Sequence, residues 1–213
     1  MERKEYSAGA VKMSFWFIEF RKVVQLLHDG KSMDEIKELA HSENIFAAPT
    51  ALRSNQIYST VAGRIRSLDQ SFIPYFLTGD LATQKLYALI AAMAYDTLFF
   101  DFVYEVIREK MIVGSNELAD SDVRVFFKNK QQQNEKVAGW TDATLVRLGR
   151  CYKTMLYEAG VIDKSKTART ILKPIFDPEL SRWLEQKNMA IYEKALTAVS
   201  YTHLRAHETT LHL

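Results

Sequence analysis

Hydrophobic side chains recur at helical spacing through most of the chain. In residues 14–28, Trp16, Phe20, Val23, Val24 and Leu27 recur at intervals of three or four positions and share one face. A 3.6-residue period of this kind predicts an amphipathic helix. Ser14 is expected to be its N-cap, because serine accepts a hydrogen bond from the free amides of a first turn.

Two further helices are predicted in the first part of the chain. Ser32 is followed three residues later by Glu35, which is the pattern of a capping box at a helix start. Thr50 is expected to cap a third helix, whose inward face includes Ile57 and Val61. Three helices with short connections predict a helix-turn-helix-like module over residues 1–79.

Residues 80–112 are predicted to form one long buried helix at the centre of the fold. The apolar run reaches Tyr95, but Asp96, Asp101 and Glu105 follow it. Each carboxylate would cost roughly 3 kcal/mol at the middle of a bilayer. A buried core helix is therefore favoured over a membrane span, and no membrane partner is expected.

Residues 80–198, which include this central helix, are predicted to form a second helical module. A helix is expected to begin at Asp120 or Ser121, and another to be capped by Thr141 and to end near Gly160. Residues 169–176 are β-branched and aromatic enough for a short strand, which Pro174 confines to a sheet edge.

Helix, helix and then an edge strand suit a winged-helix arrangement. A final helix is predicted to begin at Asp177-Pro178 and to carry Leu180, Trp183 and Ile191. The predicted fold class is therefore all-α, with one short β wing. The content of 8 Gly and 4 Pro agrees with long helices rather than a turn-rich barrel.

Charge is unevenly distributed along the chain. The net charge is +2, but residues 121–173 hold eleven basic and five acidic residues and so carry +6, leaving −4 elsewhere. One basic segment in a nearly neutral chain is typical of a protein that contacts phosphate backbones. The alternative is that this face is merely solvated.

The basic side chains divide into two candidate nucleic-acid-binding surfaces. Arg53 and Arg64, on the third helix, form the smaller one. On the helix that Thr141 caps, Arg147 and Arg150 lie opposite the apolar stripe, as a phosphate-contacting helix requires. The predicted residues of the larger surface are Lys128, Lys130, Arg147, Arg150, Lys153, Lys164, Lys166 and Arg169.

Motifs of enzymes and cofactor sites are missing from the sequence. It has no G-x-G-x-x-G, Walker A or G-x-S-x-G pattern, and its single cysteine, Cys151, excludes an internal disulfide framework. His28 and His41 both lie near predicted helix ends, where the helix dipole favours a cation. We expect no catalytic residue, no metal and no cofactor.

The two ends of the chain bear on how the sequence is interpreted. Residues 199–209 resemble the in-frame translation of a transposase adapter used to build sequencing libraries, so residues 199–213 are interpreted as a non-native tail. Three of the five histidines lie there. The first six residues are charged and no apolar leader follows them, so a cytoplasmic location is expected.

Several blocks of the sequence together resemble the BrxA family, a small subunit of bacterial bacteriophage exclusion (BREX) systems. They are YSAG (6–9), SFWFIEF (14–20), ENIF (43–46), DLATQK (80–85), DTLFFDFVY (96–104), WTD (140–142) and LKPI (172–175). The resemblance implies a helical, non-enzymatic component of a phage-defence system, associated with DNA binding and likened to the RNA-binding factor NusB. Most of these blocks are apolar and do not identify binding residues.

The sequence therefore predicts a DNA-binding BREX subunit with mainly phosphate contacts and weak sequence preference. Double-stranded DNA and other BREX subunits are the expected partners. Two alternatives stay open: a protein-interaction scaffold whose basic face meets an acidic subunit, and an RNA-binding protein.

Overall fold

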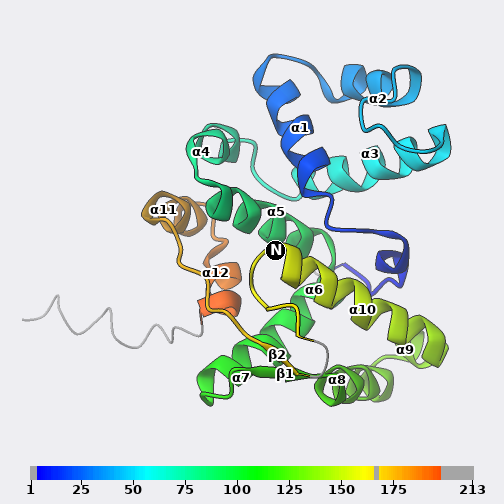
Figure 1. Cartoon of the computed structure of the whole chain (residues 1–213), viewed down its shortest axis with the longest axis vertical. Coiled ribbons are helices and arrows are strands. Elements are labelled where there is room, and N and C mark those ends of the chain that lie inside the picture. The colour runs from blue at the N-terminus through cyan, green and yellow to red at the C-terminus, as the bar shows by residue number, and fades with distance from the viewer. Residues whose placement is uncertain (1–3, 166–167, 198–213) are drawn as a thin grey trace, which may run out of the picture.

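The computed structural model describes residues 4–165 and 168–197, and it is mostly helical, with a small antiparallel sheet of two strands (Figure 1). The all-α prediction with a short β element is confirmed. Lys166 and the predicted tail of residues 199–213 lie outside the described residues.

The first three α-helices are α1 (Phe17–His28), α2 (Met33–Ser42) and α3 (Ala51–Arg66), preceded by a 3-10 turn, η1 (Gly9–Lys12). Both predicted caps are present. Ser32 and Glu35 form a capping box, and the Thr50 hydroxyl accepts a hydrogen bond from the Arg53 amide.

The predicted start of the first helix is wrong. Helix α1 begins at Phe17 rather than after Ser14, and Trp16 at its N-cap has a left-handed backbone with φ of 52°. The Trp16 ring lies 4.9 Å from the guanidinium carbon of Arg53 on α3. This cation–π contact joins the start of α1 to α3.

The predicted continuous helix over residues 80–112 is also wrong. Helix α5 (Leu81–Tyr95) is followed by α6 (Thr97–Phe102), the short π-helix η2 (Val103–Ile107) and α7 (Arg108–Ile112). The chain bends by 113° between α5 and the segment Thr97–Ile112. Asp96 causes the break, because its backbone is extended and its carboxylate accepts the amides of Leu98 and Phe99. An aspartate in this position starts a new helix.

No single helix within the described ranges is long and apolar enough to cross a membrane. Helix α5 and the segment Thr97–Ile112 pass that test of length and composition only when they are taken together as a bent pair.

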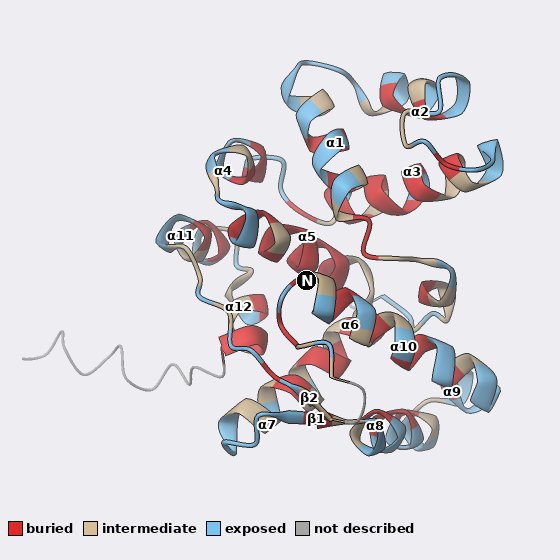
Figure 2. Cartoon of the chain, in the orientation of Figure 1, coloured by how far each residue is buried: buried red, intermediate tan, exposed pale blue. Residues whose placement is uncertain are grey.

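Helix α5 lies at the centre of the fold. It packs against α1, α3, α4 (Phe72–Thr78) and α10 (Asp142–Glu158), and every residue from Leu86 to Ala94 is buried (Figure 2). The predicted modules, residues 1–79 and 80–198, therefore share one hydrophobic core. Their boundary between α4 and α5 stays a prediction.

The C-terminal half contains the elements of a winged helix in chain order. Strand β1 (Glu117–Ala119) leads directly into α8 (Asp120–Gln133), and the short α9 (Glu135–Ala138) connects it to α10, which the Thr141 hydroxyl caps. After Gly160 the chain forms a hairpin, in which Ile162 pairs with Ile171, and β2 (Ala168–Thr170) pairs antiparallel with β1.

Two details differ from the expected wing and last helix. The strand is shorter than residues 169–176 and leaves the sheet before Pro174, because proline cannot donate to a ladder. The last helix is two helices, α11 (Pro178–Gln186) and α12 (Ala190–Thr197), separated at Asn188, which has φ of 56°. Ile191 therefore belongs to α12.

Candidate nucleic-acid interface

The predicted basic residues fall into two groups in the structure. Four of them are exposed, and their side chains make no hydrogen bond or ion pair among the residues that the structure describes: Lys128, Arg147, Arg150 and Lys164. Five others are engaged with the rest of the fold: Arg53, Arg64, Lys130, Lys153 and Arg169.

Arg64 belongs to the core and cannot reach a phosphate, so its prediction as a surface residue is corrected. Its side chain is buried and donates from Nη1 to the carbonyl of Phe15 at 2.6 Å. Burial lowers the pKa of Arg64 to about 10. The sequence held a signal of this, because Arg64 lies seven residues after Ile57 and three after Val61, on the apolar face of α3.

Arg53 is occupied within the N-terminal module. Besides stacking on Trp16, it donates to the carbonyl of Lys12 at 3.1 Å and to Oε1 of Gln56 at 2.7 Å. The smaller predicted surface therefore holds η1 and α1 against α3. A phosphate would have to displace these contacts.

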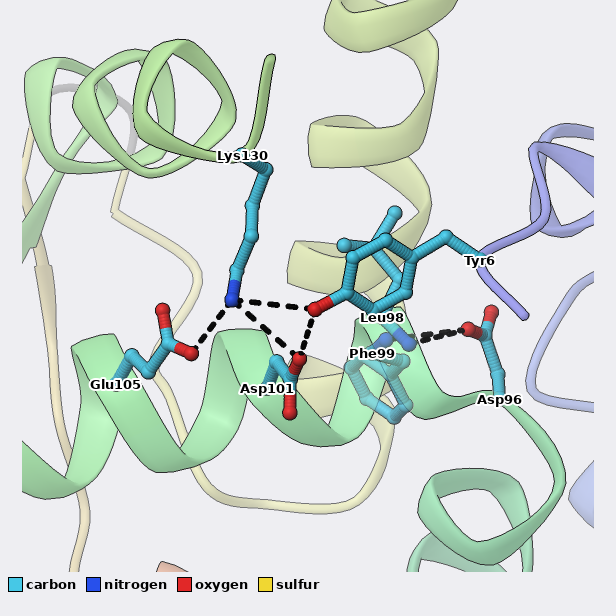
Figure 3. Close-up of polar contacts among 7 residues, drawn as sticks. All are labelled: Tyr6, Asp96, Leu98, Phe99, Asp101, Glu105 and Lys130. Carbon is cyan, nitrogen blue, oxygen red and sulfur yellow. Dashed lines mark hydrogen bonds and ion pairs between the residues drawn. The ribbon is translucent and has the colours of Figure 1, made fainter. Parts of the chain in front are cut away.

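Lys130 is likewise a structural residue, and its prediction as an exposed cation is corrected. Its side chain is only 5% exposed, and Nζ donates to Glu105 at 2.6 Å and lies 3.3 Å from both Asp101 Oδ2 and Tyr6 Oη (Figure 3). Tyr6 in turn donates to Asp101 at 2.5 Å. Burial opposes the charged form of Lys130, but the hydrogen bond to Glu105 and the carboxylate charges raise its pKa overall.

Asp120, the first residue of α8, engages two more of the predicted cations. Its carboxylate accepts a hydrogen bond from Lys153 of α10 at 2.5 Å and lies 4.0 Å from Arg169 of β2. The hydrogen bond from Lys153 is the main reason that the pKa of Asp120 is below its usual value. This carboxylate ties α8, α10 and the wing together at one point.

Helices α8 and α10 meet closely at Gly149. A Cβ built on this glycine would lie 2.6 Å from Cγ1 of Val123, so only a residue without a side chain fits there. In Figure 1, α8 is seen nearly end-on while α10 runs across the view, so the two helices are not parallel.

A hollow of about 500 Å³ lies on the outer side of this crossing. Its lining residues are the apolar Val123, Phe127, Leu145 and Val146, the basic Arg124 and Lys128 of α8, and the polar Gln131 and Asp142. Arg124 is exposed and was not among the predicted site residues, although its spacing of four from Lys128 places both on one side of α8.

The exposed cations Arg124, Lys128, Arg147 and Arg150 are called the basic face below. They come from the two helices that cross at Gly149, and none of their side chains has a hydrogen bond or ion pair within residues 4–165 and 168–197. Lys164, in the hairpin that follows α10, is also exposed. Unpaired arginines held on rigid helices suit binding of a polyanion.

Cys151 lies beside this face, but its chemistry differs from that of a nucleophile. Burial raises the pKa of its thiol, and the nearby charge of Arg147 only partly opposes this. A thiol with a raised pKa holds little thiolate at neutral pH.

The fold is mostly helical, with a small antiparallel sheet of two strands, and the crossing helices α8 and α10 carry the basic face. The BrxA family model matches residues 4–188. A BREX protein BrxA from Bacillus cereus (strain H3081.97) is 39% identical over 192 residues, covering 90% of this chain and 96% of the relative. The chain belongs to the BrxA family, whose members are components of a phage-defence system.

Two further proteins are similar to the chain at lower identity, one in sequence and one in structure. A BREX protein BrxA from Escherichia coli O9:H4 (strain HS) is 21% identical over 145 residues, covering 68% of each chain. The crystal structure of an uncharacterized protein from Magnetospirillum magneticum superposes with a TM-score of 0.77 at 20% identity, covering 92% of this chain and 100% of that one. At that identity the likeness shows a common fold.

Proposed function

We propose that this BrxA-family protein is a non-enzymatic, cytoplasmic subunit of a BREX assembly that binds duplex DNA through its basic face. The observation that carries the proposal is the position of Arg147 and Arg150. Both are exposed and unpaired among the described residues, and both lie on α10, the last helix before the β hairpin of the winged-helix unit. In such units this helix is the one that approaches the DNA groove.

The electrostatics of the basic face determine how the interaction depends on salt. Each phosphate that a protein neutralises contributes about −0.9 to the slope of log affinity against log salt on duplex DNA. If each of the four cations contacts one phosphate, the slope is roughly −3.6. Contacts of this kind position a protein on the backbone without reading sequence, which agrees with weak sequence preference.

Fluorescence anisotropy with a labelled duplex tests the proposal. We expect binding at low salt, and loss of most of it in the variant R147E/R150E. The matched control is R21E/K37E, which makes the same charge change at two exposed residues of α1 and α2. Equal losses in both variants would indicate a general charge effect and would contradict an interface on α10.

The two alternatives give different results in the same assay. A scaffold whose basic face meets an acidic surface of another BREX subunit predicts no duplex binding even at low salt. An RNA-binding protein predicts that single-stranded RNA displaces the labelled duplex more effectively than unlabelled duplex does.

A further inference from the structure

One exposed side chain on the basic face is apolar. Val146 is 50% exposed on the outer side of α10, directly before Arg147 and one turn before Arg150. It lies at the edge of the hollow that Arg124 and Lys128 also line. Because Val146 adjoins Arg147 and lies one turn from Arg150, a duplex held by these arginines would cover an apolar group as well as the cations.

Val146 also lies near the beginning of α10, four residues after Asp142, the first helical residue. When a helix of this kind enters the major groove, its N-terminal residues contact base edges and its flanks contact the backbone. The major-groove edges of the four base pairs present hydrogen-bond donors and acceptors, and a single apolar group, the C5 methyl of thymine.

We propose that Val146 contacts the C5 methyl group of thymine when α10 occupies the major groove. The inference rests on the proposed DNA-binding function and adds a base-edge contact to its phosphate contacts. Arg147 and Arg150 hold the helix against the backbone, and Val146 favours registers that place a thymine beside it. Sequence preference then stays weak, because one methyl group discriminates modestly.

The test compares duplexes that differ only in that methyl group. Alternating A·T duplexes are prepared with thymine or with uracil, so that a methyl group is present or absent in every register. Burial of one methyl group predicts roughly fourfold tighter binding of the thymine duplex by the full chain. The variant V146S is expected to bind both duplexes with the lower affinity. The matched control V125S, at an exposed valine on α8, is expected to keep the difference.

The outcomes separate this inference from the proposed function. Equal affinity of the unchanged protein for the two duplexes would overturn the thymine contact and leave DNA binding intact. A preference for thymine that persists in V146S would also overturn it, because the preference would then come from duplex shape. Failure to bind either duplex at low salt would overturn the proposed function itself.

Discussion

Replacement of Lys130 by methionine is predicted to destabilise the protein strongly while leaving the basic face in place. Lys130 joins α8 to the segment after the chain bend, because its ammonium contacts Asp101 and Glu105, and it also contacts Tyr6 of the N-terminal arm (Figure 3). Methionine fills a similar volume but carries no charge. The carboxylate of Asp101, whose side chain is only 4% exposed, then loses its cation.

The size of the effect follows from burial. Removing one partner of a buried ion pair costs about 3–5 kcal/mol, because the remaining charge stays in a poorly solvated site. Glu105 is 45% exposed and can turn towards water, so the lower end, about 3 kcal/mol, is expected. For a chain of this size, 1 kcal/mol corresponds to about 2–4 °C in Tm, which gives a fall of about 6–12 °C.

Urea unfolding followed by far-UV circular dichroism measures this loss. K128M is the matched control, because Lys128 is exposed on the same helix and is expected to change stability by less than about 0.5 kcal/mol. The double variant K130M/D101L, in which both charges are replaced by apolar groups, is expected to recover most of the stability. A K130M protein within 1 kcal/mol of the unchanged protein would refute the reasoning.

Two further predictions concern aspartates at helix starts. Burial raises the pKa of Asp96 from 3.8 to about 6, so the folded state holds a proton that the unfolded chain has already released. The free energy of unfolding should therefore fall by about 2–3 kcal/mol as the pH rises from about 4 to 6. This dependence should disappear in D96N, because asparagine also caps a helix but does not titrate. If urea unfolding of D96N keeps the same pH profile, Asp96 is not the group responsible. D120A removes the acceptor of Lys153 and should release that lysine for phosphate, giving tighter DNA binding and a salt slope steeper by about 0.9, measured by anisotropy. An unchanged slope would show that Lys153 contacts no phosphate.

Local signals in the sequence predicted local structure well. The caps at Ser32, Thr50 and Thr141 all lie where serine or threonine precedes an apolar period. The break at Asp96 was missed because the apolar run continues past it, and a single aspartate in such a run is compatible with a helix interior. Only the hydrogen bonds from its carboxylate to the following amides show that a second helix begins there.

The sequence could not predict which basic side chains are buried and which are exposed, because this depends on partners that are distant in the sequence. Tyr6 and Asp101 are 95 residues apart and meet at Lys130. Asp120 and Lys153 are 33 residues apart. A charge count treats Lys130 and Arg150 alike, whereas the fold buries one and exposes the other. Tyr6 and Asp101 also belong to two blocks that resemble the BrxA family, and the structure gives both of them a role in holding the fold together.

The salt dependence of duplex binding tests the central claim, that Arg147 and Arg150 contact phosphates, most directly. Affinities of the unchanged protein and of R147Q/R150Q are measured by anisotropy over a series of salt concentrations. Loss of two phosphate contacts predicts that the log–log slope becomes shallower by about 1.8. Parallel lines for the two proteins would contradict the claim, because arginines that do not contact phosphates release no counterions.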